Sequence, residues 1–193
     1  MQKTENNINL VWFRNDLRTI DNAVLFEAQK NSGQLIAVYC FDPRFFALDP
    51  YGFKKTEKFR AKFLIETVTD LKTQLNKLNI ELLVFNAQPE AVIPQLCEDY
   101  NINTIFLQKE WTSEELSVEN AVKSKCKDCQ WHAVYNQFLY HPEDINFKIS
   151  DTPQVFTVFR KKLEKHVNIR PELNVSKYSE DNRIKNNTKI PSL

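Results

Sequence analysis

The chain has 193 residues, a length that fits one domain and is too short for two full hydrophobic cores. Hydrophobic residues make up 42% and charged residues 26%, so the composition is that of a globular chain and excludes a disordered or fibrous one. The formal net charge of +1 offers no general phosphate-neutralising surface, and we expect no strong nucleic-acid binding by this chain alone. Gly33 and Gly52 are the only glycines, which excludes the phosphate-binding motifs GxGxxG and GxxxxGK(S/T).

The sequence also bears on the compartment. The opening segment MQKTENN is polar and unlike a signal peptide, and the longest apolar run, residues 35–41, is far shorter than a membrane span. The four cysteines fit reduced thiols better than a disulfide framework. We therefore expect a cytoplasmic protein without a membrane partner.

Short apolar runs alternate with amphipathic stretches along the first two thirds of the chain. The apolar runs predict five strands, at residues 9–13, 34–41, 81–85, 104–108 and 130–134. The stretches between them predict helices at residues 22–30, 56–78, 89–100 and 112–125. A parallel crossover needs a helix-length connection, so this alternation predicts a doubly wound, Rossmann-like α/β fold over residues 1–134. We expect five parallel strands in the order 3-2-1-4-5.

Two local features refine these helices. Asp21 is predicted to cap the first one. The long second helix carries apolar residues at spacings of three and four, namely Phe59, Phe63, Leu64, Val68, Leu71, Leu75 and Leu78. We expect Phe63, Leu64 and Val68 to be largely buried.

The last third of the chain has a different character. Residues 135–151 are aromatic and polar without a clear period, and a helix is predicted at residues 153–166. We expect residues 135–173 to form an ordered aromatic loop and helix leading toward a further helical domain. Residues 174–193 are predicted to be a polar tail that cannot offset its own ordering entropy.

Ligands of open α/β sheets bind at the carboxyl ends of the strands, where the strand order reverses. In this sequence those ends carry charged residues beside aromatic rings, namely Arg14, Asp16, Asp42 and Arg44. An alternative interpretation is that the four side chains simply pair with one another. No Ser, Cys or Thr lies at the first turn, which argues against nucleophilic catalysis, and we assign no catalytic residue.

Two other groups of residues are weaker candidates. Cys126, Cys129 and His132, with His141 further on, are residue types that bind zinc. However, the CxxC pair ends a predicted helix instead of opening one, and this position disfavours both a metal site and a redox pair. Trp12 and Trp131 lie in predicted strands, where core packing is favoured over an electron relay.

Several segments resemble one protein family. LVWFRNDLRTIDN (residues 10–22) closely resembles the opening signature of DNA photolyases and cryptochromes. Later segments are most similar to the cryptochrome-DASH branch, and they occur in the same order: VYCFDPRFF (38–46), PEAVIPQL (89–96), KEWTSEE (109–115) and LYHPEDINF (139–147). The resemblance covers about residues 9–170.

This resemblance implies the N-terminal α/β domain of a flavoprotein, the part that holds a light-harvesting antenna, usually methenyltetrahydrofolate. Glu110 is then expected to accept hydrogen bonds from the pterin edge, because a carboxylate pairs bidentately with such a group. Lys109 and Arg44 would steer the carboxylates of the folate, and Phe41 or Trp111 would flank its ring. Arg14 completes the predicted cofactor-binding set.

Family members continue into a helical domain that holds FAD and receives the damaged base, and this sequence stops before it. The family activity is that of a deoxyribodipyrimidine photo-lyase, yet we expect neither FAD binding nor DNA repair by this chain alone. A second hypothesis is a non-catalytic interaction module. Its aromatic loops would dock a separate helical partner that supplies FAD, or another protein.

Overall fold

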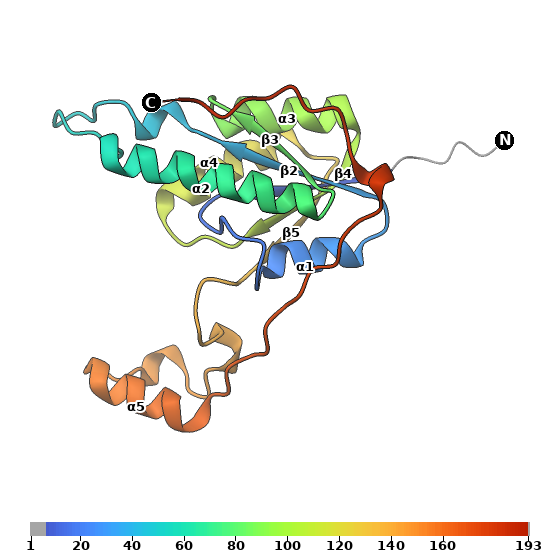
Figure 1. Ribbon diagram of the computed structural model, residues 1–193. Coiled ribbons are helices and arrows are strands. Elements are labelled where there is room, and N and C mark those ends of the chain that lie inside the picture. Colours follow the sequence, from blue (N-terminus) through green and yellow to red (C-terminus); the bar gives the residue numbers. More distant parts are fainter. Residues whose placement is uncertain (1–6, 193) are drawn as a thin grey trace.

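Five parallel strands form a single sheet in the computed structural model, which describes residues 7–192 (Figure 1). The strand order is β3-β2-β1-β4-β5, so the predicted order is confirmed. The observed bounds are β1 (Ile8–Phe13), β2 (Gln34–Cys40), β3 (Glu81–Phe85), β4 (Ile102–Gln108) and β5 (Gln130–Val134). β1 lies at the centre, where the order reverses toward β4.

Helices cover both faces of this sheet. α1 (Ala23–Lys30) and α2 (Lys58–Lys77) pack on one face, through a core that includes Leu25 and Leu71. α3 (Pro89–Tyr100) and α4 (Ser113–Lys125) pack on the other face, and their core includes Trp12. Two helical layers around one parallel sheet are the doubly wound α/β fold that the sequence predicts.

The cap of α1 differs from the prediction. Asp21 has a φ of +48° and lies in the turn before the helix, and the N-cap is Asn22. The Asn22 side chain accepts a hydrogen bond from the Leu25 N–H at 3.0 Å, which satisfies one of the free donors of the first turn.

Gly33, in the connection to β2, has a φ of +114°, and a Cβ atom there would lie 2.0 Å from the Asn7 carbonyl oxygen. Only glycine fits this position.

A lysine compensates for the proline inside α3. Pro94 has no N–H and cannot donate to the carbonyl of Glu90 four residues earlier. The Nζ of Lys125, at the end of α4, donates to that same carbonyl at 2.8 Å. The two helices on this face are therefore joined at the point where α3 lacks its own bond.

The predicted inward face of α2 is partly wrong. Val68 is buried and Leu64 is partly buried, but Phe63 is 68% exposed and Phe59 is 86% exposed. Figure 1 shows the N-terminal part of α2 projecting past the ends of the strands. Phe59 and Phe63 lie on the side of the helix opposite Val68, whereas Ala61 and Leu64 continue the buried side toward the start of α2.

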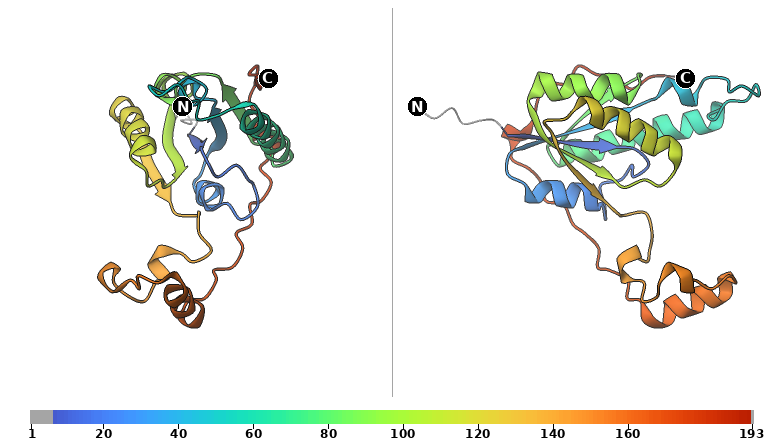
Figure 2. Two further views of the ribbon diagram at one scale, coloured as in Figure 1. Left: turned by 90° about the vertical axis from the view of Figure 1, so that its left-hand side faces the viewer. Right: turned by 180° about the vertical axis from the view of Figure 1, so that it is seen from behind.

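Two dissimilar segments follow β5. Residues 135–173, here called the lobe, contain the short 3-10 turns η2 (Pro142–Asp144) and η3 (Ile149–Asp151) and the helix α5 (Phe156–His166). The lobe has irregular backbone apart from these turns up to residue 151, and its helix begins three residues later than expected. In Figure 2 α5 stands apart from the helix-covered sheet.

The prediction of an unordered tail is wrong. Residues 174–192, here called the strap, return along the α1 and α2 side and run beside β3 (Figure 1). They include the turn η4 (Glu180–Asn182). Outside the strap, one more short turn, η1 (Pro43–Phe45), follows β2. The strap is held chiefly by hydrogen bonds between side chains and backbone, so its low apolar content did not indicate its order.

Candidate functional site

Glu110 lies just beyond the carboxyl end of β4, beside the reversal of strand order. Its side chain is buried, with the residue 7% exposed. Oε1 accepts a hydrogen bond from Asn15 Nδ2 at 3.1 Å, and Oε2 accepts one from Gln137 Nε2 at 2.8 Å. The carboxylate is therefore fixed between the loops that follow β1 and β5. Each of its oxygens can accept a further donor, because a carboxylate offers about four acceptor positions.

Aromatic rings lie beside this carboxylate. Trp111 stacks on Tyr135, with ring centroids 4.8 Å apart and planes 20° from parallel. Lys109 places its Nζ 4.5 Å from the centre of the Tyr135 ring. The Trp111 indole also donates to Gln137 Oε1 at 2.5 Å, although half of the residue remains exposed, at 48%. We call Lys109, Glu110, Trp111, Tyr135 and Gln137 the Glu110 edge.

Arg14 lies in a neighbouring cavity of about 460 Å³ between the carboxyl ends of β1 and β2 and the first turns of α3 and α4. Its guanidinium stacks 5.0 Å from the centre of the Trp12 ring and donates to the Gln108 carbonyl. Nη1 lies 3.0 Å from Glu119 Oε2, and both side chains are nearly buried. Within residues 7–192, Nε and Nη1 of Arg14 have no hydrogen-bond partner of good geometry. Both nitrogens are themselves buried, so these unpaired donors lie behind the surface of the cavity.

Arg44 lines the same cavity, but other residues engage its charge. Nε donates to Asp42 Oδ1 at 2.9 Å, and Nη1 donates to Glu90 Oε1 at 2.9 Å. Hydrogen bonding to Asp42, with a further contribution from Glu90, raises the pKa of the guanidinium. The alternative interpretation, in which the charged residues pair with one another, therefore holds for Arg44 and Asp42. Arg14 pairs with Glu119 instead.

The structure separates the six predicted residues into three groups. Lys109, Glu110 and Trp111 lie together at the Glu110 edge, and Arg14 and Arg44 lie at the cavity. Phe41 is in neither place, because it is buried in the core with its ring 5.0 Å from that of Tyr39. Asn15 connects the first two groups, since it lines the cavity and also donates to Glu110.

Sequence reasoning missed four residues that shape these sites: Asn15, Glu119, Tyr135 and Gln137. Asn15 lies inside the opening signature and could have been found there. Glu119 is a buried acid on a helix whose apolar periodicity is weak, and Gln137 lies in a segment without regular structure. Their positions depend on contacts across the sheet that local patterns do not indicate.

Burial also affects the titration of two neighbours. Asp16 is fully buried, and desolvation raises the pKa of its carboxyl group, although the Arg14 N–H donates to Oδ1 at 3.1 Å. Burial, with Asp42 nearby, raises the pKa of the Cys40 thiol to about 12. Neither group has the environment of a nucleophile at neutral pH.

The two cysteines considered for zinc lie in the core on one face of the sheet, apart from the two histidines. Cys126 is buried at the end of α4, and the Cys129 thiol donates to the Ile102 carbonyl at 3.2 Å. His132 lies in β5 against Phe106, and His141 lies against Tyr135. Among the described residues, no three His, Cys, Asp or Glu side chains are placed to hold a metal ion.

No helix among residues 7–192 is long and apolar enough to cross a membrane.

Comparison with known proteins identifies the family. The sequence matches the DNA photolyase family over residues 9–177. It is 42% identical over 166 residues to the cryptochrome DASH of Gloeobacter violaceus, covering 85% of this chain and 33% of that protein. It is 45% identical over 165 residues to the cryptochrome DASH of Synechocystis, covering 84% of this chain and 34% of that protein.

The fold agrees with this relationship. The crystal structure of the Synechocystis sp. PCC6803 cryptochrome superposes with a TM-score of 0.81 and 38% identity, covering 97% of this chain and 38% of that one. The archaeal photolyase of Sulfolobus tokodaii shares the fold, with a TM-score of 0.73 and 23% identity over 88% of this chain. The chain spans about a third of the length of the curated relatives it matches. It belongs to the DNA photolyase family and is similar to the N-terminal part of cryptochromes DASH.

Proposed function

We propose that this chain is the antenna-binding part of a photolyase- or cryptochrome-type protein, and that the Glu110 edge holds a folate-type chromophore such as methenyltetrahydrofolate. The observation that carries this proposal is the buried Glu110 carboxylate at the reversal of strand order. Its two oxygens are oriented by Asn15 and Gln137 and still have acceptor positions available. A pterin presents adjacent amino and N–H donors, which a carboxylate accepts with charge-assisted bonds.

The surroundings of Glu110 also fit a flat heterocycle. Trp111, half exposed and stacked on Tyr135, offers an aromatic face, and exposed Lys109 provides a positive charge near it. Because Asp42 and Glu90 already engage Arg44, Lys109 is the better placed cation for the carboxylates of a folate. When bound, such a chromophore absorbs light and transfers the excitation energy. The residues of this chain bind and orient it.

We expect weak affinity, because Trp111 remains half exposed and small ligands gain most of their affinity from enclosure. We also expect that this chain alone neither binds FAD tightly nor repairs DNA. It covers about a third of its relatives, and its net charge of +1 offers no broad surface for phosphates.

The test is a fluorescence titration of methenyltetrahydrofolate into the wild-type chain and Glu110→Gln. The substitution keeps the size of the side chain but replaces one charged acceptor with a donor, so affinity should fall by about tenfold or more. Glu66→Gln is the matched control, because Glu66 is an exposed carboxylate on α2 away from the site. Equal affinities of wild type and Glu110→Gln would remove Glu110 from the site.

The cavity near Arg14 is the competing location, since its volume of about 460 Å³ is that of a typical ligand pocket. Ser117→Trp would fill this cavity without touching Glu110. Loss of binding in Ser117→Trp, together with retention in Glu110→Gln, would place the chromophore there and contradict the proposal for the Glu110 edge.

A second candidate function, a non-catalytic interaction module, is favoured by a different observation. Large apolar side chains are exposed on the loop before α2 and on its first turns, and contiguous exposed apolar surface typically marks an interaction site. These residues are Leu48, Tyr51, Phe53, Phe59 and Phe63. The partner would be a separate helical, flavin-binding protein. The test is the absorption spectrum of protein purified in the dark. Absorption at wavelengths longer than those of the aromatic side chains favours the antenna function, whereas a colourless chain that binds no folate favours the interaction module.

A further inference from the structure

The strap alternates between inward and outward residues although it is not a regular strand. From residue 182 to residue 190, every second side chain is buried or half-buried and each one between is exposed. The inward residues are Asn182, Ile184, Asn186, Thr188 and Ile190. A period of two is that of an extended chain, so the strap presents one continuous side to the body of the protein.

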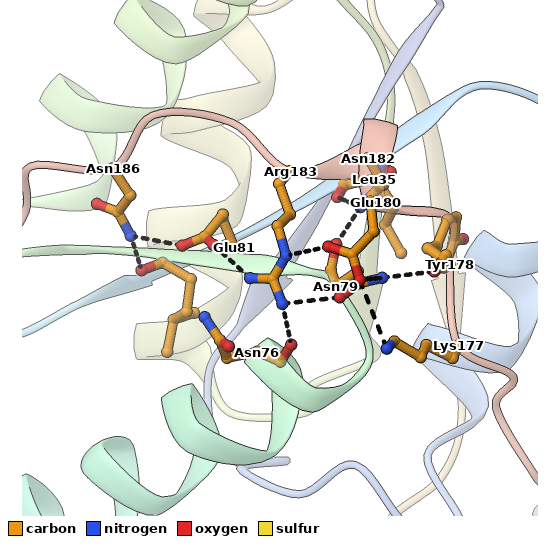
Figure 3. A network of polar contacts seen from close by, with 11 residues as sticks. Leu35, Asn76, Asn79, Glu81, Lys177, Tyr178, Glu180, Asn182, Arg183 and Asn186 are labelled. Atoms are coloured by element: carbon orange, nitrogen blue, oxygen red, sulfur yellow. Dashed lines mark hydrogen bonds and ion pairs between the residues drawn. The ribbon is translucent and has the colours of Figure 1, made fainter.

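The start of this extended part is held by Asn182, which is 3% exposed. Its Oδ1 accepts the Leu35 N–H at 2.8 Å, and its Nδ2 donates to the Leu35 carbonyl at 2.9 Å and to the Asn79 carbonyl at 2.7 Å (Figure 3). One side-chain amide thus pairs with both backbone groups of Leu35, as a neighbouring strand would. The amino ends of β2 and β3 are joined through this residue.

Further along, the strap pairs with the outer edge of β3. Asn186 Nδ2 donates to the Leu82 carbonyl at 2.8 Å, and Thr188 Oγ1 accepts the Val84 N–H at 2.9 Å. In a parallel strand, residues alternate in the side to which their backbone groups point, so Leu82 and Val84 face away from β2. The strap therefore meets the open edge of the sheet with side-chain amides and a hydroxyl in place of backbone groups.

Arg183 fastens the strap to the end of α2. Its Nη2 donates to the Asn76 carbonyl at 3.1 Å and to Asn79 Oδ1 at 2.8 Å, and its Nε donates to Glu180 at 2.9 Å (Figure 3). A positive group there satisfies a carbonyl of the last helical turn. The strap is thus fixed at the helix end, at the start of β2 and along β3, by contacts separated by roughly a hundred residues or more in the sequence.

We propose that the outer edge of β3 is an interaction surface for an extended segment, that the strap occupies it in this chain, and that release of the strap lets β3 pair with β3 of a second copy. An open edge presents unpaired N–H and C=O groups, which are a template for another strand. The proposal is independent of chromophore binding, because the Glu110 edge lies at the other side of β1.

A second copy fits this edge better than an arbitrary segment. β3 has the sequence ELLVF, whose apolar residues favour pairing with another such strand. Two copies related by a twofold axis would align β3 antiparallel to itself about Leu83, which makes the contact self-complementary. Glu81 of one copy would then lie opposite Phe85 of the other, so no like charges face each other.

The experiment uses the full chain with Asn182→Ala, Asn186→Ala and Thr188→Val combined, which removes the hydrogen bonds of the inward side and retains its apolar contacts. Asn187→Ala is the matched control, because Asn187 is exposed on the outward side. Sedimentation velocity at about 10 µM and about 300 µM should show concentration-dependent dimers for the triple variant and monomers for the control, a range in which exposed strand edges associate. A triple variant that stays monomeric while circular dichroism shows it folded would overturn the proposal.

A milder variant keeps the proposal testable if the triple variant does not fold. Thr188→Val removes one acceptor, and hydrogen exchange of the Val84 amide should become about three- to tenfold faster, the effect of losing one hydrogen bond. A synthetic peptide of residues 174–192, added to the triple variant, should return it to a monomer. Unchanged exchange at Val84 in Thr188→Val would show that the strap does not guard the edge of β3.

Discussion

The strap and the lobe both follow β5, but the polar strap docks on the body of the protein whereas the helix of the more apolar lobe does not. The lobe contains Phe147, Phe156 and Phe159, yet α5 stands apart from the sheet and Phe156 is exposed. The strap is rich in Asn, Lys and Ser, yet it lies on the body and contains a buried asparagine. Apolar content alone therefore does not decide which segment docks.

The difference lies in what each segment meets. The strap meets backbone groups that need partners, at the start of β2, along the edge of β3 and at the end of α2. Burying such groups without partners costs more than an ordinary hydrogen bond contributes, so a polar segment that satisfies them is retained. The lobe contacts the body at its two ends, where Gln137 donates to Glu110 and the Leu173 N–H donates to Asp21. Between these ends it packs on itself, as when Phe147 meets Phe159 edge-on with centroids 6.0 Å apart.

The largest expected effect on stability concerns α2, where a covered and an uncovered apolar side chain can be compared on one helix. Leu71→Ala should lower the free energy of unfolding by about 2–5 kcal/mol, because this side chain is buried against the sheet and its loss leaves a cavity. Phe63→Ala should change it by less than about 0.5 kcal/mol, because Phe63 is largely exposed. Urea unfolding of both variants checks this. A large loss in Phe63→Ala would show that this side chain is covered in solution.

Asn182→Ala tests the anchoring of the strap directly. The substitution leaves the N–H and carbonyl of Leu35 and the carbonyl of Asn79 without their partner, at a cost of about 2–4 kcal/mol. Asn187→Ala, an exposed neighbour, should cost less than about 0.5 kcal/mol. Urea midpoints of the two variants provide the comparison. Equal midpoints would mean that the strap contributes nothing to stability and that the contrast with the lobe is wrong.

Limited proteolysis compares the two segments within one molecule. Trypsin should cut the lobe, at Arg160, Lys161 and Lys162, at least about tenfold faster than the strap, at Lys185 and Lys189, because segments with few contacts open locally at low free energy. Mass spectrometry of early fragments measures both rates. First cuts in the strap would reverse the proposed order of local stability.

The alternation of strands and helices could be predicted from the sequence. All five strands and the helices α1 to α4 lie within two residues of their predicted bounds, because apolar runs and the breaks between them indicate where each element begins and ends. The position of Glu110 could be predicted because it comes just after the carboxyl end of β4. Its partners, Asn15 and Gln137, come from two other loops, and no local pattern brings such loops together.

The strap was missed for a related physical reason. Its inward side consists mostly of Asn and Thr, which anchor through hydrogen bonds, and a search for apolar periodicity passes over such residues. The exposed Phe63 shows the reverse error. Spacings of three and four were assigned to one inward side, but Phe63 lies about 140° around the helix from Val68, on the outward side.

The smallest expected effect concerns the acidic contacts of the strap. A hydrogen bond from Arg183, with a smaller contribution from one donated by Asn79, lowers the pKa of the Glu180 carboxyl below its ordinary value of 4.5. A lowered pKa in the folded state means that the ionised carboxylate stabilises the fold above pH 4.5, and that this stabilisation is lost as the pH falls through the folded-state value. Glu180→Gln should therefore be slightly less stable than wild type at neutral pH, and the difference should vanish in acid.

The lobe supplies the matched control for this effect. Arg170 likewise lowers the pKa of Asp144, but that ion pair joins two parts of the lobe. At neutral pH, Glu180→Gln should therefore speed hydrogen exchange of the Val84 amide beneath the strap, whereas Asp144→Asn should leave it unchanged. Both variants are measured against wild type by exchange across the acid range. If Asp144→Asn changed the protection of Val84 as much as Glu180→Gln does, the two segments would be coupled, and the stability of the strap could no longer be treated apart from that of the lobe.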